Sequence, residues 1–340
     1  KKHEIYTVLA KVTVMATGGV GNIYHTTTNP SVATGDGVAM VHRAKGVIEN
    51  MEFIQFHPTS LYNPGERPSF LITEAMRGFG GLLRLQNGKE FMQKYHPMGS
   101  LAPRDVVARS IDHELKISGE EFVYLDITHK DPKEVMSHFP NIYKKCLSIG
   151  IDLTKDMIPV VPAAHYCCGG IKVNLNGESS IRRLYALGEA SSTGLHGGNR
   201  LASNSMMEAA VYADAAARHA ISVIDSIELQ RDIPAWDYEG TAVPEEMALI
   251  TQDYKEMQQI MTNYVGIVRS DVRLERAKRR LEIIFKETEE LYLKSTLSQH
   301  LCELRNMIAV GYLIIKQAEA RHESVGLHYS IDYPAKPVEI

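Results

Sequence analysis

Residues 6–19 read YTVLAKVTVMATGG, a stretch rich in β-branched side chains that stops at a pair of glycines. This composition predicts one or two β-strands that end in a tight turn. Further strands are predicted at Ile171–Val173 and Leu184–Leu187. Helices are predicted within Thr34–Gly46 and from Met206 to about His219. Alternation of strands and helices is typical of an α/β domain.

The middle of the chain interrupts this pattern. Residues 51–165 contain more Pro, His and Phe, and they alternate short strands with helices. The clearest helix starts at Pro103 and places Val107, Ile111 and Leu115 on one face. An α+β domain inserted into the α/β domain accounts for this order.

A third kind of segment begins near Ala235, where glycines become rare. Apolar residues recur there with helical spacing, in two stripes. The stripes are Leu274, Ala277, Leu281, Ile284 and Leu291, and Leu301, Leu304, Ile308 and Ile315. Together with residues 247–268, they predict a C-terminal unit of three helices.

Composition narrows the class of protein. The 340 residues are 44% apolar and 23% charged, which suits two or three folded domains and excludes global disorder. Thirty-seven Lys and Arg stand against 41 Asp and Glu, without a block of five like charges, which argues against a nucleic-acid partner. The longest apolar run, Met307–Ile315, falls short of the roughly 20 residues that span a bilayer.

The four cysteines are Cys146, Cys167, Cys168 and Cys302, and none forms a CxxC pair. This spacing argues against a disulfide framework and against a zinc or iron–sulfur site, so we expect reduced thiols, no metal and a cytoplasmic location. The chain opens with Lys1-Lys2-His3, without an initiator Met or a signal peptide. We therefore expect it to be part of a longer chain.

Four basic side chains stand in unusual settings: His57 (QFHPT), Arg104 (APRD), His165 (AAHY) and Arg200 (GGNR). Taken singly, each is explained as well by a packed imidazole or a solvated charge. Arg104, however, begins a helix, where its charge opposes the helix dipole unless it faces an anion or Asp105 offsets it. Two Arg and two His in separate loops suit a small dicarboxylate, because guanidinium binds carboxylate with two hydrogen bonds.

A second group of residues suits a cofactor. Ser205 and Glu208 match the capping box S-x-x-E, so a helix should begin at Ser205 with its N–H groups directed at negative charge. Glu189 follows a strand, where it could accept hydrogen bonds from hydroxyl groups, and Asp36 could do the same or only form a turn. The cluster from Gly18 to Gly21 does not fit the G-x-G-x-x-G spacing, so we do not assign a dinucleotide fingerprint to it.

Together, these segments resemble one family, the flavoprotein subunits of succinate dehydrogenase and fumarate reductase with the L-aspartate oxidases. The matching stretches are Ala16–Gly19 (ATGG), Thr34–Gly37 (TGDG), Met51–Thr59 (MEFIQFHPT), Leu71–Gly78 (LITEAMRG), Leu101–Arg109 (LAPRDVVAR), Tyr185–Glu189 (YALGE) and His196–Ser205 (HGGNRLASNS). Three others are most similar to the L-aspartate oxidase branch: Leu125–Lys130 (LDITHK), Cys168–Gly170 and Ala202–Ser205.

The resemblance implies a noncovalent FAD and a role for each matching residue. The implied FAD contacts are Asp36, Glu189, Ser205 and Met206. The implied substrate-binding residues are His57, Thr73, Glu74, His165 and Arg200, with Arg104 transferring a proton. It also implies four segments: 1–50, part of an FAD-binding domain with a Rossmann-like fold; 51–165, a capping domain; 166–234, the return of the FAD-binding domain; and 235–340, a helical domain.

The implied reaction is oxidation of L-aspartate to iminoaspartate, the first step of quinolinate and NAD biosynthesis, with O2 or fumarate as electron acceptor. Other dicarboxylates, including succinate, and quinolinate synthase as the downstream enzyme are the implied partners. The alternatives are a succinate dehydrogenase or fumarate reductase flavoprotein and a folded fragment without catalytic activity.

Three departures from the family pattern stand out. The half of the FAD-binding domain that binds ADP is missing, so we expect the 340-residue chain to be inactive and to hold no stoichiometric FAD; a yellow preparation would refute this. Phe79 replaces the Glu of RGEG, which predicts a missing hydrogen bond nearby, and Val325 replaces the Arg of ESRG.

Overall fold

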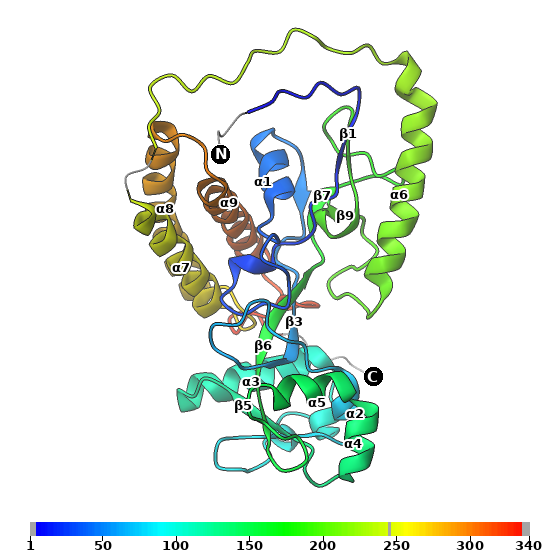
Figure 1. Ribbon diagram of the computed structural model, residues 1–340, viewed down its shortest axis with the longest axis vertical. Helices are drawn as coiled ribbons and strands as arrows, with labels where there is room; N and C mark the ends of the chain where they lie inside the picture. Colours follow the sequence, from blue (N-terminus) through cyan, green and yellow to red (C-terminus); the bar gives the residue numbers. More distant parts are fainter. Residues whose placement is uncertain (1–4, 244–245, 335–340) are drawn as a thin grey trace. The chain divides into compact units, whose positions relative to one another are not determined.

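The computed structural model describes residues 5–243 and 246–334, so Lys1–His3, which suggested a longer chain, lie outside the described residues (Figure 1). The chain divides into two compact units. Unit 1 comprises Lys1–His25, Ser31–Gln55 and Tyr166–Ile340, and unit 2 comprises Thr26–Pro30 and Phe56–His165.

Unit 1 contains two small sheets. Strand β1 (Thr13–Met15) pairs in parallel with β8 (Leu184–Ala186), and β7 (Gly170–Lys172) lies between antiparallel β2 (Ile48–Glu49) and parallel β9 (Ser191–Ser192). The prediction of one or two strands across residues 6–16 is therefore correct only for Thr13–Met15. The prediction fails for the rest of the segment because β8 is three residues long and, within this segment, pairs with Thr13–Met15 alone.

Both helices predicted in the part of the chain that forms unit 1 are present. Helix α1 (Asp36–Arg43) begins after Gly35, whose φ of 76° is in the left-handed region that glycine adopts without strain. Helix α6 (Asn204–Val223) is longer than expected, and 3-10 turns occur at η1 (Gly21–Ile23), η4 (Gly188–Ala190) and η5 (Ile224–Ser226).

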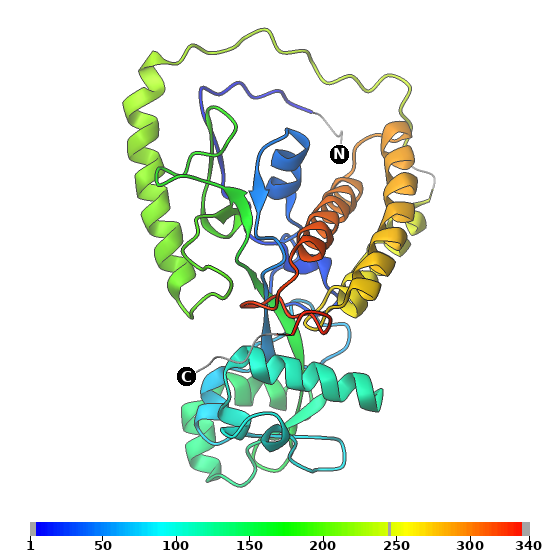
Figure 2. The same cartoon turned by 180° about the vertical axis from the view of Figure 1, so that it is seen from behind.

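The three predicted C-terminal helices are confirmed as α7 (Met247–Tyr264), α8 (Asp271–Lys294) and α9 (Gln299–Ala320). The hydroxyls of Ser270 and Ser298 cap α8 and α9 by accepting backbone N–H groups. Both predicted stripes are buried except for Leu291, since α7, α8 and α9 pack on one another, and α9 also packs on α1 (Figure 2).

Unit 2 is built on a sheet of order β3-β6-β5-β4. Its strands are β3 (Ile54–Leu61), β4 (Leu82–Arg84), β5 (Val123–Asp126) and β6 (Ile158–Cys167), of which β3 and β6 extend by two residues into unit 1. Its helices are α2 (Glu74–Gly78), α3 (Arg104–Ser118), α4 (Pro132–His138) and α5 (Pro140–Leu147), with 3-10 turns η2 (Met92–Lys94) and η3 (Gly99–Leu101).

The core of unit 2 explains why these segments fold together. Ile72, Met76, Leu83, Ile111 and Leu125 are fully buried in one cluster, drawn from segments that are up to 53 residues apart in sequence (125 − 72). Burial of each such side chain contributes about 1.5–3 kcal/mol to folding. The unit is thus α+β, as predicted. Over residues 5–243 and 246–334, no helix has the length and apolarity needed to cross a bilayer.

Candidate active site

Strands β3 and β6 hold two histidines against each other in unit 2. The rings of His57 and His165 are 5.6 Å apart between centroids, at 66°. Nδ1 of His57 lies 3.3 Å from the backbone N and 3.2 Å from the backbone O of Thr59, and Nδ1 of His165 lies 2.8 Å from Oγ1 of Thr28. Both imidazoles are thus oriented through one nitrogen, which directs the other nitrogen of each ring elsewhere.

Burial and nearby basic side chains both disfavour the charged form of His57. Burial lowers its pKa to about 3, with further lowering from His165, Arg104 and Arg77. His57 is therefore neutral at physiological pH and carries one ring proton. An anion bound among these groups would relieve their mutual repulsion.

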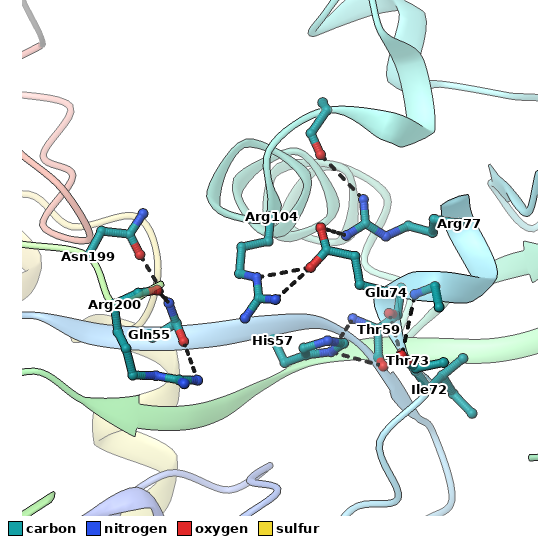
Figure 3. Close-up of polar contacts among 12 residues, drawn as sticks. Gln55, His57, Thr59, Ile72, Thr73, Glu74, Arg77, Arg104, Asn199 and Arg200 are labelled. Carbon is teal, nitrogen blue, oxygen red and sulfur yellow. Dashed lines mark hydrogen bonds and ion pairs between the residues drawn. The ribbon is translucent and has the colours of Figure 1, made fainter. Parts of the chain in front are cut away.

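Arg104 and Glu74 form an ion pair in the same unit (Figure 3). Oε2 of Glu74 accepts hydrogen bonds from Nη2 of Arg104 at 2.6 Å and from Nε at 3.2 Å. The partner that Arg104 needs at the helix start is therefore Glu74. The alternative that Asp105 offsets its charge is wrong, because Asp105 pairs with Arg109 one turn further along α3.

Arg77 is buried on the other side of Glu74. Its Nη2 lies 3.3 Å from Oε1 of Glu74, and its Nη1 donates to the carbonyl of Ser100 at 2.8 Å. Its Nε has no hydrogen-bond partner among the described residues. The ring of Phe79 packs on His138, at 4.6 Å between centroids, and offers no acceptor. The hydrogen bond that we predicted to be missing near Phe79 stays a prediction.

Thr73 and Val325 have local roles in the structure. Oγ1 of Thr73 accepts the N–H of Ala75 at 3.3 Å and so caps α2, the helix that presents Glu74. The N–H of Val325 donates to the carbonyl of His328 in a turn.

Arg200 belongs to unit 1, unlike the other predicted substrate residues. Its Nη2 donates to Oε1 of Gln55 at 2.9 Å, and Nε2 of Gln55 donates to the carbonyl of Arg200 and to Oδ1 of Asn199 (Figure 3). Sequence analysis missed Gln55. The available signal was its place two residues before His57, because residues i and i+2 of a strand share a face.

The capping-box prediction at Ser205 is wrong. Helix α6 has Ser203 as its N-cap, with φ of 69° and no side-chain cap. Glu208 does not reach back to the helix start because three side chains hold it: Nε2 of His196 at 2.8 Å, Oη of Tyr166 at 3.1 Å and Oγ1 of Thr193. Ser205 instead accepts a hydrogen bond from Nη1 of Arg200 at 3.4 Å.

Glu189 lies three residues after the end of β8, in the turn η4. Its Oε1 accepts the N–H of Cys167 at 3.0 Å. A Cβ on Gly19 would lie 2.2 Å from the same oxygen, so the carboxyl group packs on glycine backbone. Burial raises the pKa of Glu189 to about 7, against the lowering effect of the Cys167 hydrogen bond and of Arg200.

Asp36 begins α1. Its Oδ1 accepts hydrogen bonds from Oγ1 of Thr34 at 2.9 Å and from Nδ2 of Asn306 on α9 at 2.7 Å. The carboxylate therefore joins the TGDG turn to the C-terminal helices. Met206 differs from the other predicted cofactor residues because it is 79% exposed.

Comparison with known proteins decides the family. Residues 1–206 match the profile described as FAD binding domain, and residues 254–337 match that described as fumarate reductase flavoprotein C-term. The chain belongs to the succinate dehydrogenase/fumarate reductase flavoprotein family. FAD is the cofactor of this family, and the α/β, inserted α+β and C-terminal helical plan is confirmed as its fold.

Curated relatives of this flavoprotein include two L-aspartate oxidases. The chain is 48% identical to that of Pseudomonas aeruginosa, over 97% of its own length and 61% of the relative, and 48% identical to that of Yersinia pestis, over 98% and 62%. A solved structure of E. coli quinol fumarate reductase is 30% identical, with a TM-score of 0.79 over 97% of this chain and 62% of the other. The chain thus spans about three-fifths of the length of these relatives.

The residues of unit 1 fit a flavin. The helix α6 N-terminus lacks a side-chain cap, and Leu201, Met206 and Met207 around it are 72%, 79% and 65% exposed. An uncapped helix end favours partial negative charge, and exposed apolar side chains favour a flat ring. The carboxyl group of Glu189 also packs against Gly19, where there is no room for a side chain. It places an acidic group next to glycine backbone.

Proposed function

We propose that this flavoprotein is part of an L-aspartate oxidase, which oxidises L-aspartate to iminoaspartate with O2 or fumarate as electron acceptor. Relatives at 48% identity carry that name. The observation that carries the proposal is the group of basic side chains in unit 2, where neutral His57 lies against His165 and close enough to Arg104 for that charge to lower its pKa. Such a group suits a dianionic substrate.

His57, Thr73, Glu74, His165 and Arg200 bind the substrate in this proposal. Nδ1 of His57 accepts the N–H of Thr59, which places the ring proton on Nε2. The Nε2–H group then donates a hydrogen bond to a substrate carboxylate. Arg200 supplies two parallel N–H groups to a carboxylate. Orientation of the reacting carbon by such contacts lowers the barrier by about 7–11 kcal/mol in favourable cases.

Arg104 is the proton-transfer residue. Because Glu74 fixes its Nε and Nη2, the position of the guanidinium is defined before substrate binds. A guanidinium holds its proton tightly, so Arg104 acts most readily as an acid, which suits reduction of fumarate.

Asp36, Glu189, Ser205 and Met206 are the residues that would hold FAD. Bound FAD supplies the acceptor for the hydride that leaves the substrate carbon. The uncapped N-terminus of α6 favours negative charge near Ser205, and neutralisation of Glu189 near its pKa of about 7 lets this carboxyl donate as well as accept a hydrogen bond.

Residues 1–50 and 166–234 then form parts of the FAD-binding domain, 51–165 the capping domain and 235–340 the helical domain. The iminoaspartate product would be consumed by quinolinate synthase, and the enzyme would work in the cytoplasm.

Turnover of the full-length, FAD-loaded protein tests the proposal. We expect L-aspartate to be oxidised with O2 as acceptor and succinate to bind as a competitor. Oxidation of succinate without oxidation of L-aspartate would contradict it. That result would favour a succinate dehydrogenase or fumarate reductase flavoprotein, the second candidate, which the likeness to the E. coli reductase supports.

A further inference from the structure

A buried polar network lies beside Arg200 within unit 1. The side chains of His196 and Glu208 are 3% and 1% exposed, and Nε2 of His196 donates to Oε2 of Glu208 at 2.8 Å. Oη of Tyr166 donates to the same oxygen at 3.1 Å and lies 3.2 Å from Nε2 of His196. Thr193 donates to the other oxygen of Glu208.

These contacts keep the buried carboxylate of Glu208 ionised. Burial alone would raise the pKa of Glu208, but the donors His196, Thr193 and Tyr166 outweigh it, and the pKa is lowered. A buried carboxylate with several donors is rigid, since moving any one donor leaves a charge unsatisfied. The hydroxyl end of the Tyr166 side chain is thereby fixed.

The ring face of Tyr166 stacks on the guanidinium of Arg200. The guanidinium carbon of Arg200 lies 4.5 Å from the centre of the Tyr166 ring, which is cation–π distance. Gln55 constrains the same guanidinium at one edge through the 2.9 Å hydrogen bond from Nη2. A guanidinium that stacks by its face offers the N–H groups of its edge to an anion, so the ring decides which way those groups point.

We propose that Tyr166 is a positioning residue that sets the orientation of Arg200, and that Glu208 and His196 hold Tyr166 in place. The inference rests on the proposed function, in which Arg200 binds a carboxylate of the substrate. Tyr166, Glu208 and His196 do not touch the substrate in this scheme. Their effect is on substrate affinity rather than on the chemical step.

Substitutions at Tyr166 test this in the full-length, FAD-loaded protein. Tyr166→Leu removes the ring, and we expect KM for L-aspartate to rise about tenfold while kcat stays within about threefold. Tyr166→Phe keeps the ring and removes its tether, and Glu208→Gln weakens the same tether. Each should raise KM by about threefold. An unchanged KM in Tyr166→Leu would overturn the proposal.

The double variant Tyr166→Phe/Glu208→Gln is the sharper measurement, and it does not depend on whether Tyr166→Leu folds. Because both substitutions break one tether, we expect KM of the double variant to equal that of either single variant within a factor of two. A ninefold rise, the product of two independent effects, would overturn the tether.

Tyr185 provides a matched control for loss of a buried tyrosine. It is 2% exposed, and its Oη lies 2.8 Å from Nδ1 of His219, but it stands on β8. We expect Tyr185→Leu to lower the melting temperature and leave KM unchanged. An equal rise of KM in Tyr185→Leu would mean that loosening of unit 1, and not positioning, changes affinity.

Succinate binding separates failure of this inference from failure of the proposed function. The dissociation constant is measured from the change in flavin absorbance on titration with succinate, which needs no turnover. If L-aspartate is not oxidised but succinate binding weakens in Tyr166→Leu and not in Tyr185→Leu, the proposed function fails and the positioning role stands. If L-aspartate is oxidised and neither variant changes KM or succinate binding, the positioning role fails alone.

Discussion

Glu74 holds the guanidinium of Arg104 at two nitrogen atoms, 2.6 Å from Nη2 and 3.2 Å from Nε. The arginine opens helix α3, whose dipole repels it, and the glutamate opens α2, whose dipole attracts it. The carboxylate of Glu74 thus compensates for the unfavourable position of the Arg104 charge at the start of α3. The sequence alone leaves that position unexplained. This arrangement has a direct kinetic consequence.

Arg104→Lys keeps the charge but not the fork that spans Glu74. If Arg104 transfers the proton, we expect kcat for fumarate reduction to fall at least about 100-fold, with KM changed less than about fivefold. Glu74→Gln, which keeps an acceptor and loses the charge, should lower kcat by about tenfold. Steady-state kinetics measure both, and Arg109→Lys, on the same helix and paired with Asp105, is the control expected to keep wild-type kcat.

Arg200→Ala removes a buried guanidinium that we assign to substrate binding. Because hydrogen bonds to charged groups are worth about 1.5–3 kcal/mol, we expect KM for L-aspartate and the dissociation constant of succinate to rise about 10- to 150-fold. Arg218→Ala is the matched control, since Arg218 is 79% exposed on α6 and pairs only with neighbouring Asp214 among the described residues. Unchanged kinetics in Arg200→Ala would remove this residue from the site.

His57 makes stability depend on pH. Its pKa is about 3 in the folded protein and near 6.5 when unfolded, so the unfolded chain takes up the proton first as pH falls. The free energy of unfolding therefore decreases as pH drops below about 6.5. Between pH 6.5 and 5, this effect amounts to about 2 kcal/mol.

His57→Gln removes that titration. We expect the variant to lose about 2 kcal/mol less stability than the wild type between pH 7 and pH 5. Urea denaturation at several pH values measures the difference. Above pH 7.5 the two stability curves should run parallel, and parallel curves throughout would show that His57 is not the buried neutral imidazole described above.

Gly19→Ala tests the acidic turn that we assign to FAD. The added Cβ would lie 2.2 Å from Oε1 and 2.4 Å from Cδ of Glu189, so the carboxyl group must move. We expect the flavin-to-protein ratio of the purified full-length protein, read from its absorbance, to fall by half or more. Gly78→Ala is the control and should leave the ratio unchanged. Apart from its chain neighbours and its own helix backbone, no atom of the described residues lies within 4 Å of a Cβ there.

The helical tail illustrates what could be predicted from sequence. The stripes through Leu274 and Leu301 identified two helices, and Ser270 and Ser298 mark where they begin. Local periodicity and capping suffice there because neighbouring helices bury whichever face is apolar. The segment at residues 6–16 failed for the opposite reason, since a strand exists only where another strand bonds to it.

Glu208 shows the same limit at the candidate site. Its spacing from Ser205 predicted a capping box, but His196, Thr193 and Tyr166 provide three donors from other segments, and these outcompete one backbone N–H. Gln55 and Tyr166, the two residues that constrain Arg200, lie in the motifs QFHPT and AAHY. They were not predicted because neither side chain carries a charge.

The sequence by itself determined the family, the order of α/β, inserted α+β and helical segments, and the residue types that carry the chemistry, because motifs and periodicity are properties of neighbouring positions. Only the tertiary structure decided which partners those residues have: Glu74 for Arg104, Gln55 and Tyr166 for Arg200, and Gly19 for Glu189. The partners are 30, 145, 34 and 170 positions apart (104 − 74, 200 − 55, 200 − 166 and 189 − 19). Contacts over such distances depend on how the whole chain packs, and packing is set by core burial rather than by any local pattern.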